Sequence, residues 1–183
     1  SENMKFEKVE GAKRRFTAVK LTLLIGTCAF SASAANYPAA VLADAASRRT
    51  MGFMAGNRDF LVGAEMLQSC GLAALPDPTL LSAWDHRILL THGDALCLSD
   101  TTYQAFRAQV RSAAWRNRFL AQPLATRERL AREMRDASEA TKRGRAPLDW
   151  GDVDAATAVA WMHAAGSHTL VHGHTHRPGS EVL

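Results

Sequence analysis

Three histidines lie within five residues near the end of the chain, in the segment LVHGHTHRP, Leu170 to Pro178. On a strand, His172, His174 and His176 would share one face, where three imidazoles are costly unless a ligand organises them. In a turn after a strand, Gly173 would let the backbone change direction and a ligand approach. A plain surface run is the alternative. Imidazole is the commonest ligand of borderline divalent metals, so the cluster predicts a metal site.

Two earlier segments also place polar side chains directly after an apolar run. GNRD (56–59) and HGD (92–94) each follow a run that predicts a strand, as HGHTH (172–176) does. The carboxyl ends of strands are where α/β folds hold ligands, so we expect these turns to meet. Their ligand-type side chains provide one amide oxygen and three imidazoles, a set suited to Mn, Fe or Zn. These candidate ligands are Asn57, His92, His174 and His176, and the expected strands cover Thr50–Met54, Arg87–Thr91 and Thr169–Val171.

The remaining pattern is mainly helical. An alanine-rich run predicts a helix over Ala39 to Arg49, and a long amphipathic stretch predicts helix over about Thr102 to Lys142, broken near Pro123. A further helix is expected over Asp149 to Ala164. Strands that alternate with helices favour an α/β fold.

The chain has 183 residues, 47% hydrophobic and 22% charged, which predicts a globular domain with a buried core. Its formal net charge is +4 at pH 7, and the basic residues gather in one stretch. Such a stretch suits an anionic membrane surface, a phosphorylated substrate or nucleic acid, and a solvated helix face is the plain alternative. Nucleic acid fits least, because aromatic residues are not interleaved with the basic ones. The stretch contains Arg107, Arg111, Arg116, Arg118, Arg127, Arg129, Arg132, Arg135, Lys142, Arg143 and Arg145.

The N-terminal segment resembles an export signal. Basic residues between Lys13 and Lys20 precede an apolar stretch, Leu21 to Phe30, and small residues end at Ala34 or Ala35. The apolar stretch is too short to span a bilayer, and a buried helix or strand at the domain edge is the alternative. The three cysteines lack metal-site spacing and point instead to free thiols in a reducing compartment.

The three turns resemble the motifs of the calcineurin-like metallophosphoesterases, GN[HR]D, HGD and GHTH. The segments GNRDFLVG (56–63), LTHGDALCLSDTTYQAFR (90–107), MRDAS (134–138) and HGHTHRP (172–178) are similar to one branch, the UDP-2,3-diacylglucosamine pyrophosphatases of lipid A biosynthesis. The resemblance implies an α/β metallophosphoesterase sandwich over 37–183, with a helical cap inserted at about 101–147. Residues 1–36 would then be an export-signal-like or unrelated leader.

The resemblance also implies roles for single residues. Asn57, His92 and His174 would bind one metal ion and His176 the other, while His172 would support them. Arg58 stands where the superfamily usually has a catalytic histidine, so its guanidinium would steady the phosphate oxygens without donating a proton. Residues expected to hold the substrate are Asn57, Arg58, Asp100, Tyr103, Arg135, Ser138, Thr141, Lys142, Arg145 and His174. Apolar cap residues available for acyl chains are Trp115, Phe119, Leu120, Leu124 and Leu130.

The implied function is metal-dependent hydrolysis of UDP-2,3-diacylglucosamine to UMP and 2,3-diacylglucosamine 1-phosphate, with two Mn²⁺ ions. The implied location is the cytoplasmic face of the inner membrane, as a peripheral membrane protein attracted by the basic cap. An export signal would conflict with this location.

The sequence departs from the family pattern before Asn57. Members of the family open with an Asp-x-His strand and a second strand ending in Gly-Asp, but the first histidine here is His86. The resemblance therefore predicts an incomplete sandwich and weak activity, and leaves open whether the chain holds two ions or one. The alternatives are an inactive or single-metal remnant that binds nucleotide sugar or lipid, and a generic metal-dependent phosphodiesterase.

Overall fold

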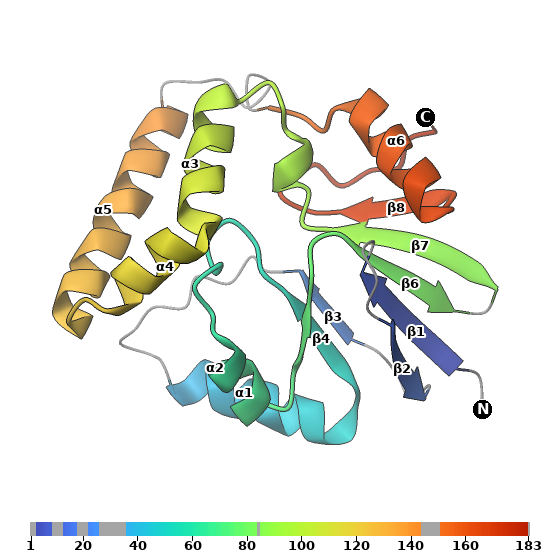
Figure 1. The fold of residues 1–183 in the computed structure, drawn as a ribbon, viewed down its shortest axis with the longest axis horizontal. Helices are drawn as coiled ribbons and strands as arrows, with labels where there is room; N and C mark the ends of the chain where they lie inside the picture. Colours follow the sequence, from blue (N-terminus) through green and yellow to red (C-terminus); the bar gives the residue numbers. More distant parts are fainter. Residues whose placement is uncertain are drawn as a thin grey trace. The chain divides into compact units, whose positions relative to one another are not determined.

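The computed structural model describes residues 3–8, 13–17, 22–25, 36–83, 85–143 and 151–182, with side chains from residue 39 onward except those of 141–143. The chain forms two compact units (Figure 1). Unit 1 contains Ser1–Leu96 and Asp154–Leu183, and unit 2 contains Cys97–Val153. Unit 2 is thus inserted into the chain of unit 1.

Unit 1 contains two sheets. The five-stranded sheet has the order β2 (Lys13–Thr17), β1 (Asn3–Lys8), β6 (Thr79–Ala83), β7 (His86–Thr91), β8 (Thr169–His172). Only β7 and β8 are parallel neighbours in it. The three-stranded sheet has the order β3 (Thr22–Ile25), β4 (Met51–Met54), β5 (Ala73–Leu75), and both of its pairings are parallel.

Side chains from both sheets form the central core. Met54 of β4 and Leu75 of β5 pack with Ala83 of β6 and Leu90 of β7. Burial of these apolar side chains holds the two sheets face to face. The expected α/β sandwich is therefore confirmed.

Helices cover the outer faces of the sheets. Phe53 packs with residues of α1 (Asn36–Arg48) and α2 (Ala64–Ser69), whereas Leu89 packs with α6 (Ala155–Ala165). Successive residues of β7 thus reach opposite layers, because side chains alternate across a strand. This arrangement explains why the run at 88–90 is apolar throughout.

Helix α6 is fixed at both ends. Asp154 caps its first turn, since its side chain accepts a hydrogen bond from the Thr157 amide at 2.8 Å. Gly166 ends it with a φ of 58°, and Arg87 donates to the carbonyls of Ala165 and Gly166 at 2.8 and 3.0 Å. The helix expected from residue 149 therefore begins only at Ala155.

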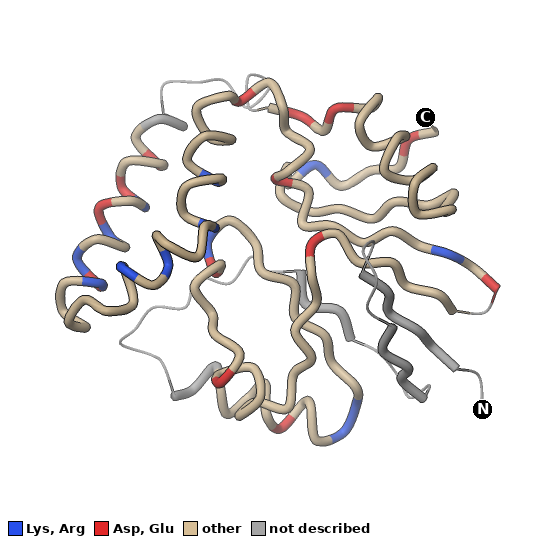
Figure 2. Tube along the Cα trace, viewed as in Figure 1, with Lys and Arg blue, Asp and Glu red and all other residues tan. Residues whose placement is uncertain are grey.

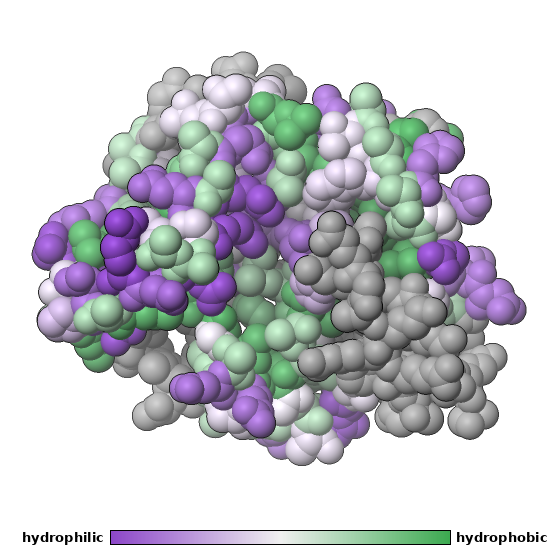
Figure 3. All heavy atoms as spheres, viewed as in Figure 1, coloured by the Kyte–Doolittle hydropathy of each residue, from purple (hydrophilic) through white to green (hydrophobic). Residues whose placement is uncertain are grey.

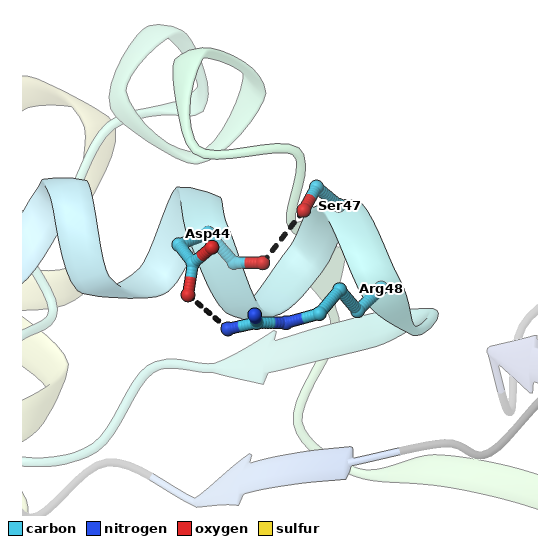
Figure 4. Close-up of polar contacts among 3 residues, drawn as sticks. All are labelled: Asp44, Ser47 and Arg48. Atoms are coloured by element: carbon cyan, nitrogen blue, oxygen red, sulfur yellow. Dashed lines mark hydrogen bonds and ion pairs between the residues drawn. The ribbon is translucent and has the colours of Figure 1, made fainter.

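The outer helix α1 carries a polar surface of its own. Arg48 forms an ion pair with Asp44 one turn earlier, and Ser47 donates to the Asp44 carbonyl at 2.7 Å (Figure 4). Both charged side chains are exposed, so this pair contributes little to stability. The helix matches the one expected over Ala39 to Arg49.

The two ends of the insertion leave unit 1 at neighbouring backbone positions. The Asp154 amide donates to the Leu96 carbonyl at 2.9 Å, and both residues belong to unit 1. Leu96 itself ends a short 3-10 helix, η2 (Asp94–Leu96), and is fully buried. The base of the insertion is therefore anchored in the core.

Unit 2 contains three helices among its described residues: α3 (Thr101–Arg111), α4 (Ala113–Leu120) and α5 (Leu124–Arg143). The expected break near Pro123 is confirmed, but a second break occurs at Ser112. The Ser112 side chain ends α3 by donating to the Gln109 carbonyl and begins α4 by accepting from the Trp115 amide. Basic residues cluster on α4 and α5 (Figure 2).

Three strands lie within residues 1–36, where the sequence suggested a leader. Strands β1 and β2 belong to the five-stranded sheet and β3 pairs with β4, which fits the alternative of a strand at the domain edge. The division of the chain at residue 36, and that of the cap at about 101–147, stay predictions. Among the described residues, none of the helices is both long and apolar enough to cross a bilayer.

Candidate active site

The GNRD turn follows directly from β4, whose residues are all buried. The buried side chain of Asp59 accepts a hydrogen bond from the Gly56 amide, and the Val62 amide donates to the Asp59 carbonyl at 3.0 Å. These two hydrogen bonds, both within residues 56–62, fix the shape of the turn. Asn57 is left half-buried and Arg58 exposed at the end of the strand.

Asn57 meets His92 at the carboxyl end of β7. Nε2 of His92 lies 3.2 Å from Oδ1 of Asn57 and 3.3 Å from its backbone nitrogen. The first contact needs a hydrogen on Nε2, whereas the second needs the Nε2 lone pair, so a single tautomer forms only one of them. His92 is 1% exposed, so the packing around it restricts movement of the ring away from Asn57.

His174 joins this pair through the parallel pairing of β7 with β8. Thr91 is the register partner of His172, and the Gly173 amide donates to the His92 carbonyl at 3.0 Å just beyond the strands. The ring centroids of His92 and His174 are 5.2 Å apart, in an edge-to-face arrangement. His92 therefore lies in contact with Asn57 and beside His174.

The HGHTH segment is a turn beyond residue 172 rather than a continued strand. Gly173 is not among the residues with a positive φ, whereas His174 and His176 are, with φ values of 68° and 54°. Left-handed backbone is unfavourable for residues with a side chain and often marks a functional site. His172 lies on β8, where its Nδ1 contacts the Gly173 carbonyl at 3.0 Å.

The Gly93 and Gly173 turns are packed too closely for a side chain. Gly93 has a φ of 101°, and a Cβ atom there would lie 3.1 Å from the Gly173 carbonyl oxygen and 3.3 Å from Cβ of His172. Glycine is therefore required at position 93 both for its backbone conformation and for space. This close approach brings the turns that carry His92 and His174 together.

The spacing of Asn57 and His92 fits a shared divalent ion. Two ligand atoms that each lie about 2.1 Å from one ion are about 3.0–3.4 Å apart at octahedral or tetrahedral angles. The observed 3.2 Å between Oδ1 and Nε2 lies within this range. Among the described residues, no group of three or more His, Cys, Asp or Glu side chains is placed to hold a metal. Asn57 supplies an amide oxygen, which is outside those residue types.

The remaining substrate candidates lie in unit 2. Asp100 caps α3 and accepts from the Tyr103 amide at 3.0 Å, and Tyr103 is half-buried beside Phe106. Arg135 and Ser138 lie on α5, half-buried and exposed respectively. Thr141 and Lys142 belong to the same helix, but their side chains are outside the described part, as is Arg145 entirely.

One further residue, Asp77, was not singled out from the sequence. Its Oδ1 accepts from the Thr91 hydroxyl at 2.6 Å and from the His92 amide at 3.2 Å. Nothing in the stretch LPDP (75–78) pointed to a turn fifteen residues later. Asp77 holds the start of the His92 turn by these two bonds.

No protein-family model matches the chain. It is 45% identical over 145 residues to the UDP-2,3-diacylglucosamine hydrolase of Chromobacterium violaceum, a match covering 79% of this chain and 61% of that protein. It is 47% identical over 140 residues to the enzyme of that name from Xanthomonas axonopodis pv. citri, covering 72% and 56%, respectively. The match with the Xanthomonas oryzae pv. oryzae enzyme is 46% over 137 residues.

The chain thus spans 56 to 61% of the length of these relatives. The matched part nevertheless covers 72 to 79% of the chain itself, at an identity of 45 to 47%. Over that part, the chain is a homologue of the UDP-2,3-diacylglucosamine hydrolases.

Proposed function

We propose that this chain forms part of the active site that hydrolyses the pyrophosphate bond of UDP-2,3-diacylglucosamine, giving UMP and 2,3-diacylglucosamine 1-phosphate. The observation that carries the proposal is the convergence of Asn57, His92 and His174 from three strand ends. The names of the relatives supply the substrate.

The proposed cofactor is Mn²⁺, with two ions in the complete site. Asn57, His92 and His174 would hold one ion, and His176 would contribute to the second. Such ions supply Lewis-acid stabilisation of charge on the phosphate oxygens. Asn57 contributes a neutral oxygen and the histidines contribute neutral nitrogen when their lone pairs face the ion, so the site adds no negative charge of its own to repel the diphosphate.

Arg58 is the proposed catalytic side chain that contacts the phosphate. Arg58 follows Asn57 directly and is exposed, so its guanidinium can contact a substrate that binds at the Asn57 turn. A guanidinium stays protonated at neutral pH and binds two phosphate oxygens at once. Arg58 would therefore stabilise charge that develops in the transition state, and would not transfer a proton.

The substrate's uridine and sugar are assigned to unit 2. Asp100 and Tyr103 begin α3, and Arg135 and Ser138 lie on α5. The Asp100 Oδ1 atom accepts from the Tyr103 amide in the helix cap, which fixes the direction of the carboxylate. The full proposed set adds Thr141, Lys142 and Arg145 to these and to Asn57, Arg58 and His174.

An anionic membrane surface is the proposed second partner, reached from the cytoplasm. Leu120 and Leu124 flank the α4–α5 turn and are 44% and 59% exposed. Arg116 and Arg118 lie one turn earlier, and hydrophilic and apolar side chains alternate over this part of unit 2 in Figure 3. Exposed leucines beside arginines suit insertion into a headgroup layer that carries negative charge.

The test is release of UMP by the purified chain from UDP-2,3-diacylglucosamine, with and without Mn²⁺. The expected result is Mn²⁺-dependent release that is lost in His92→Ala and retained in Asp44→Ala, which removes an exposed carboxylate on α1. Binding of Mn²⁺ without UMP release would contradict the proposal and favour a remnant that binds nucleotide sugar or lipid. Cleavage of a simple aryl phosphodiester without UMP release would favour a generic phosphodiesterase.

A further inference from the structure

The β6–β7 ladder cannot continue by backbone bonds as far as the His92 turn. Thr79 pairs with Leu90, so the same register would place Pro78 opposite Thr91 and Asp77 opposite His92. Proline has no amide hydrogen to donate. The ladder therefore loses a donor at Pro78, and the end of β7 needs a different anchor on this side.

The Asp77 carboxylate takes that place. Its Oδ1 accepts from the Thr91 hydroxyl at 2.6 Å and from the His92 amide at 3.2 Å, and the Thr91 oxygen in turn accepts from the Gly93 amide at 3.1 Å. Thr91 and His92 are 0% and 1% exposed, so these donors are out of reach of water. One carboxylate oxygen thus accepts from Thr91 and His92, and the Thr91 hydroxyl links the Gly93 amide to them.

These bonds decide where the His92 ring points. Nε2 lies at the far end of the side chain, so a small rotation of the His92 backbone moves it away from Asn57 Oδ1, now 3.2 Å distant. A metal ligand must lie within a few tenths of an ångström of its place. Residues behind a ligand therefore affect ion affinity without touching the ion.

We propose that Asp77 is a positioning residue for His92, one that sets the affinity of the Asn57, His92 and His174 site through the backbone of the Thr91–Gly93 turn. The part of this inference that concerns an ion rests on the proposed function. The part that concerns the turn does not.

The first experiment measures Mn²⁺ binding to the full chain by the loss of the free-ion EPR signal. Asp77→Ala should raise the Kd at least about tenfold, the usual effect of losing a group behind a metal ligand. Asp77→Asn keeps an Oδ1 acceptor and should stay within about threefold of wild type. Asp44→Ala is the matched control, since it removes an exposed carboxylate bound only within α1, and should leave the Kd unchanged. A Kd for Asp77→Ala within about twofold of wild type would overturn the proposal.

The second experiment separates this inference from the proposed function. If the wild-type chain binds no Mn²⁺, the proposed cofactor is wrong, and amide hydrogen exchange decides the role of Asp77. Exchange at His92 and Gly93 should be at least about tenfold faster in Asp77→Ala, measured against Leu89 in the buried middle of β7, and should be restored in Asp77→Asn. An unchanged ratio to Leu89 would overturn the proposal.

A second variant covers the case in which Asp77→Ala does not fold. Thr91→Val keeps the shape of the side chain but removes the hydroxyl between Asp77 and the Gly93 amide. Exchange should then accelerate at Gly93 more than at Leu89. Equal acceleration at both amides would assign the hydroxyl to general stability and overturn the positioning role.

Discussion

Oδ1 of Asn57 lies 3.2 Å from Nε2 of His92, 35 residues later in the chain. The Asp59 turn after β4 holds Asn57, and the end of β7 holds His92. The distance between the two atoms therefore depends on the packing of the two sheets. A shared ligand is the simplest chemical use of such a pair.

Removing either side chain should weaken Mn²⁺ binding by about tenfold or more. Asn57→Ala and His92→Ala each remove one donor to the same ion, so the double variant should lose much less than the sum of the two losses in free energy. Isothermal titration of all four proteins checks this coupling. Strictly additive losses would show that the two residues do not serve one ion.

Arg58→Ala should lower kcat by about 100-fold while the Kd for Mn²⁺ stays the same, because the guanidinium acts on the phosphate and not on the ion. Arg58→Lys should recover only part of the rate, since an ammonium cannot bind two oxygens in the same plane. Arg49→Ala removes an exposed arginine just after α1 and serves as the control. Parallel loss of metal and turnover in Arg58→Ala would contradict the role.

Gly93→Ala should destabilise unit 1 by about 1–3 kcal/mol, because alanine is strained in this backbone conformation and its Cβ would press on the Gly173 carbonyl. Urea denaturation gives the free energy of unfolding. Gly179→Ala is the control, since nothing lies within 4 Å of a Cβ at that position. Equal stability of the two variants would show that the turns readily separate.

The cap of α6 should make stability sensitive to acid. A hydrogen bond from the Thr157 side chain, and then one from its amide, lower the pKa of Asp154 below its ordinary value of 3.8. A depressed folded pKa stabilises the fold above the unfolded pKa, and this contribution disappears as the pH falls through the folded value. Asp154→Asn keeps a capping oxygen without titrating. Wild type should therefore lose its advantage over this variant below about pH 4, and a difference that does not change with pH would refute the linkage.

Replacing both Leu120 and Leu124 by serine should weaken binding to vesicles of phosphatidylethanolamine and phosphatidylglycerol by at least about tenfold. Each leucine contributes roughly 1.5 kcal/mol or more if it is fully buried in lipid. Val41→Ser changes a similarly exposed apolar residue on α1 and is the control. Co-sedimentation measures the bound fraction. Equal binding of the two variants would place the membrane contact elsewhere.

The strand ends before Asn57, His92 and His174 could be predicted from the sequence, because each follows an apolar run. The run at 88–90 is apolar throughout since β7 is covered on both faces. The role of Asp77 was not readable, because it depends on the register of β6 against β7. The left-handed backbone of His174 and His176 was not predicted, because glycine is the residue that usually takes this conformation.

The first and last residues of helices were predicted less accurately where a side chain forms a hydrogen bond with the backbone. Ser112 divides a stretch that is helical by pattern alone, and the Asp154 cap starts α6 at Ala155, six residues later than the apolar pattern suggested. Strands β1 to β3 were not assigned, because a basic run followed by an apolar one fits both an export signal and sheet strands.

The hydrogen bond between Asp154 and Leu96 has a consequence for how this architecture can change. A segment whose two ends are held next to each other can be lengthened, shortened or exchanged at little cost, since doubling a loop adds only about 0.6 kcal/mol of closure entropy. The 97–153 insertion can therefore be exchanged as one module at a single stem, without disturbing the sheets of unit 1.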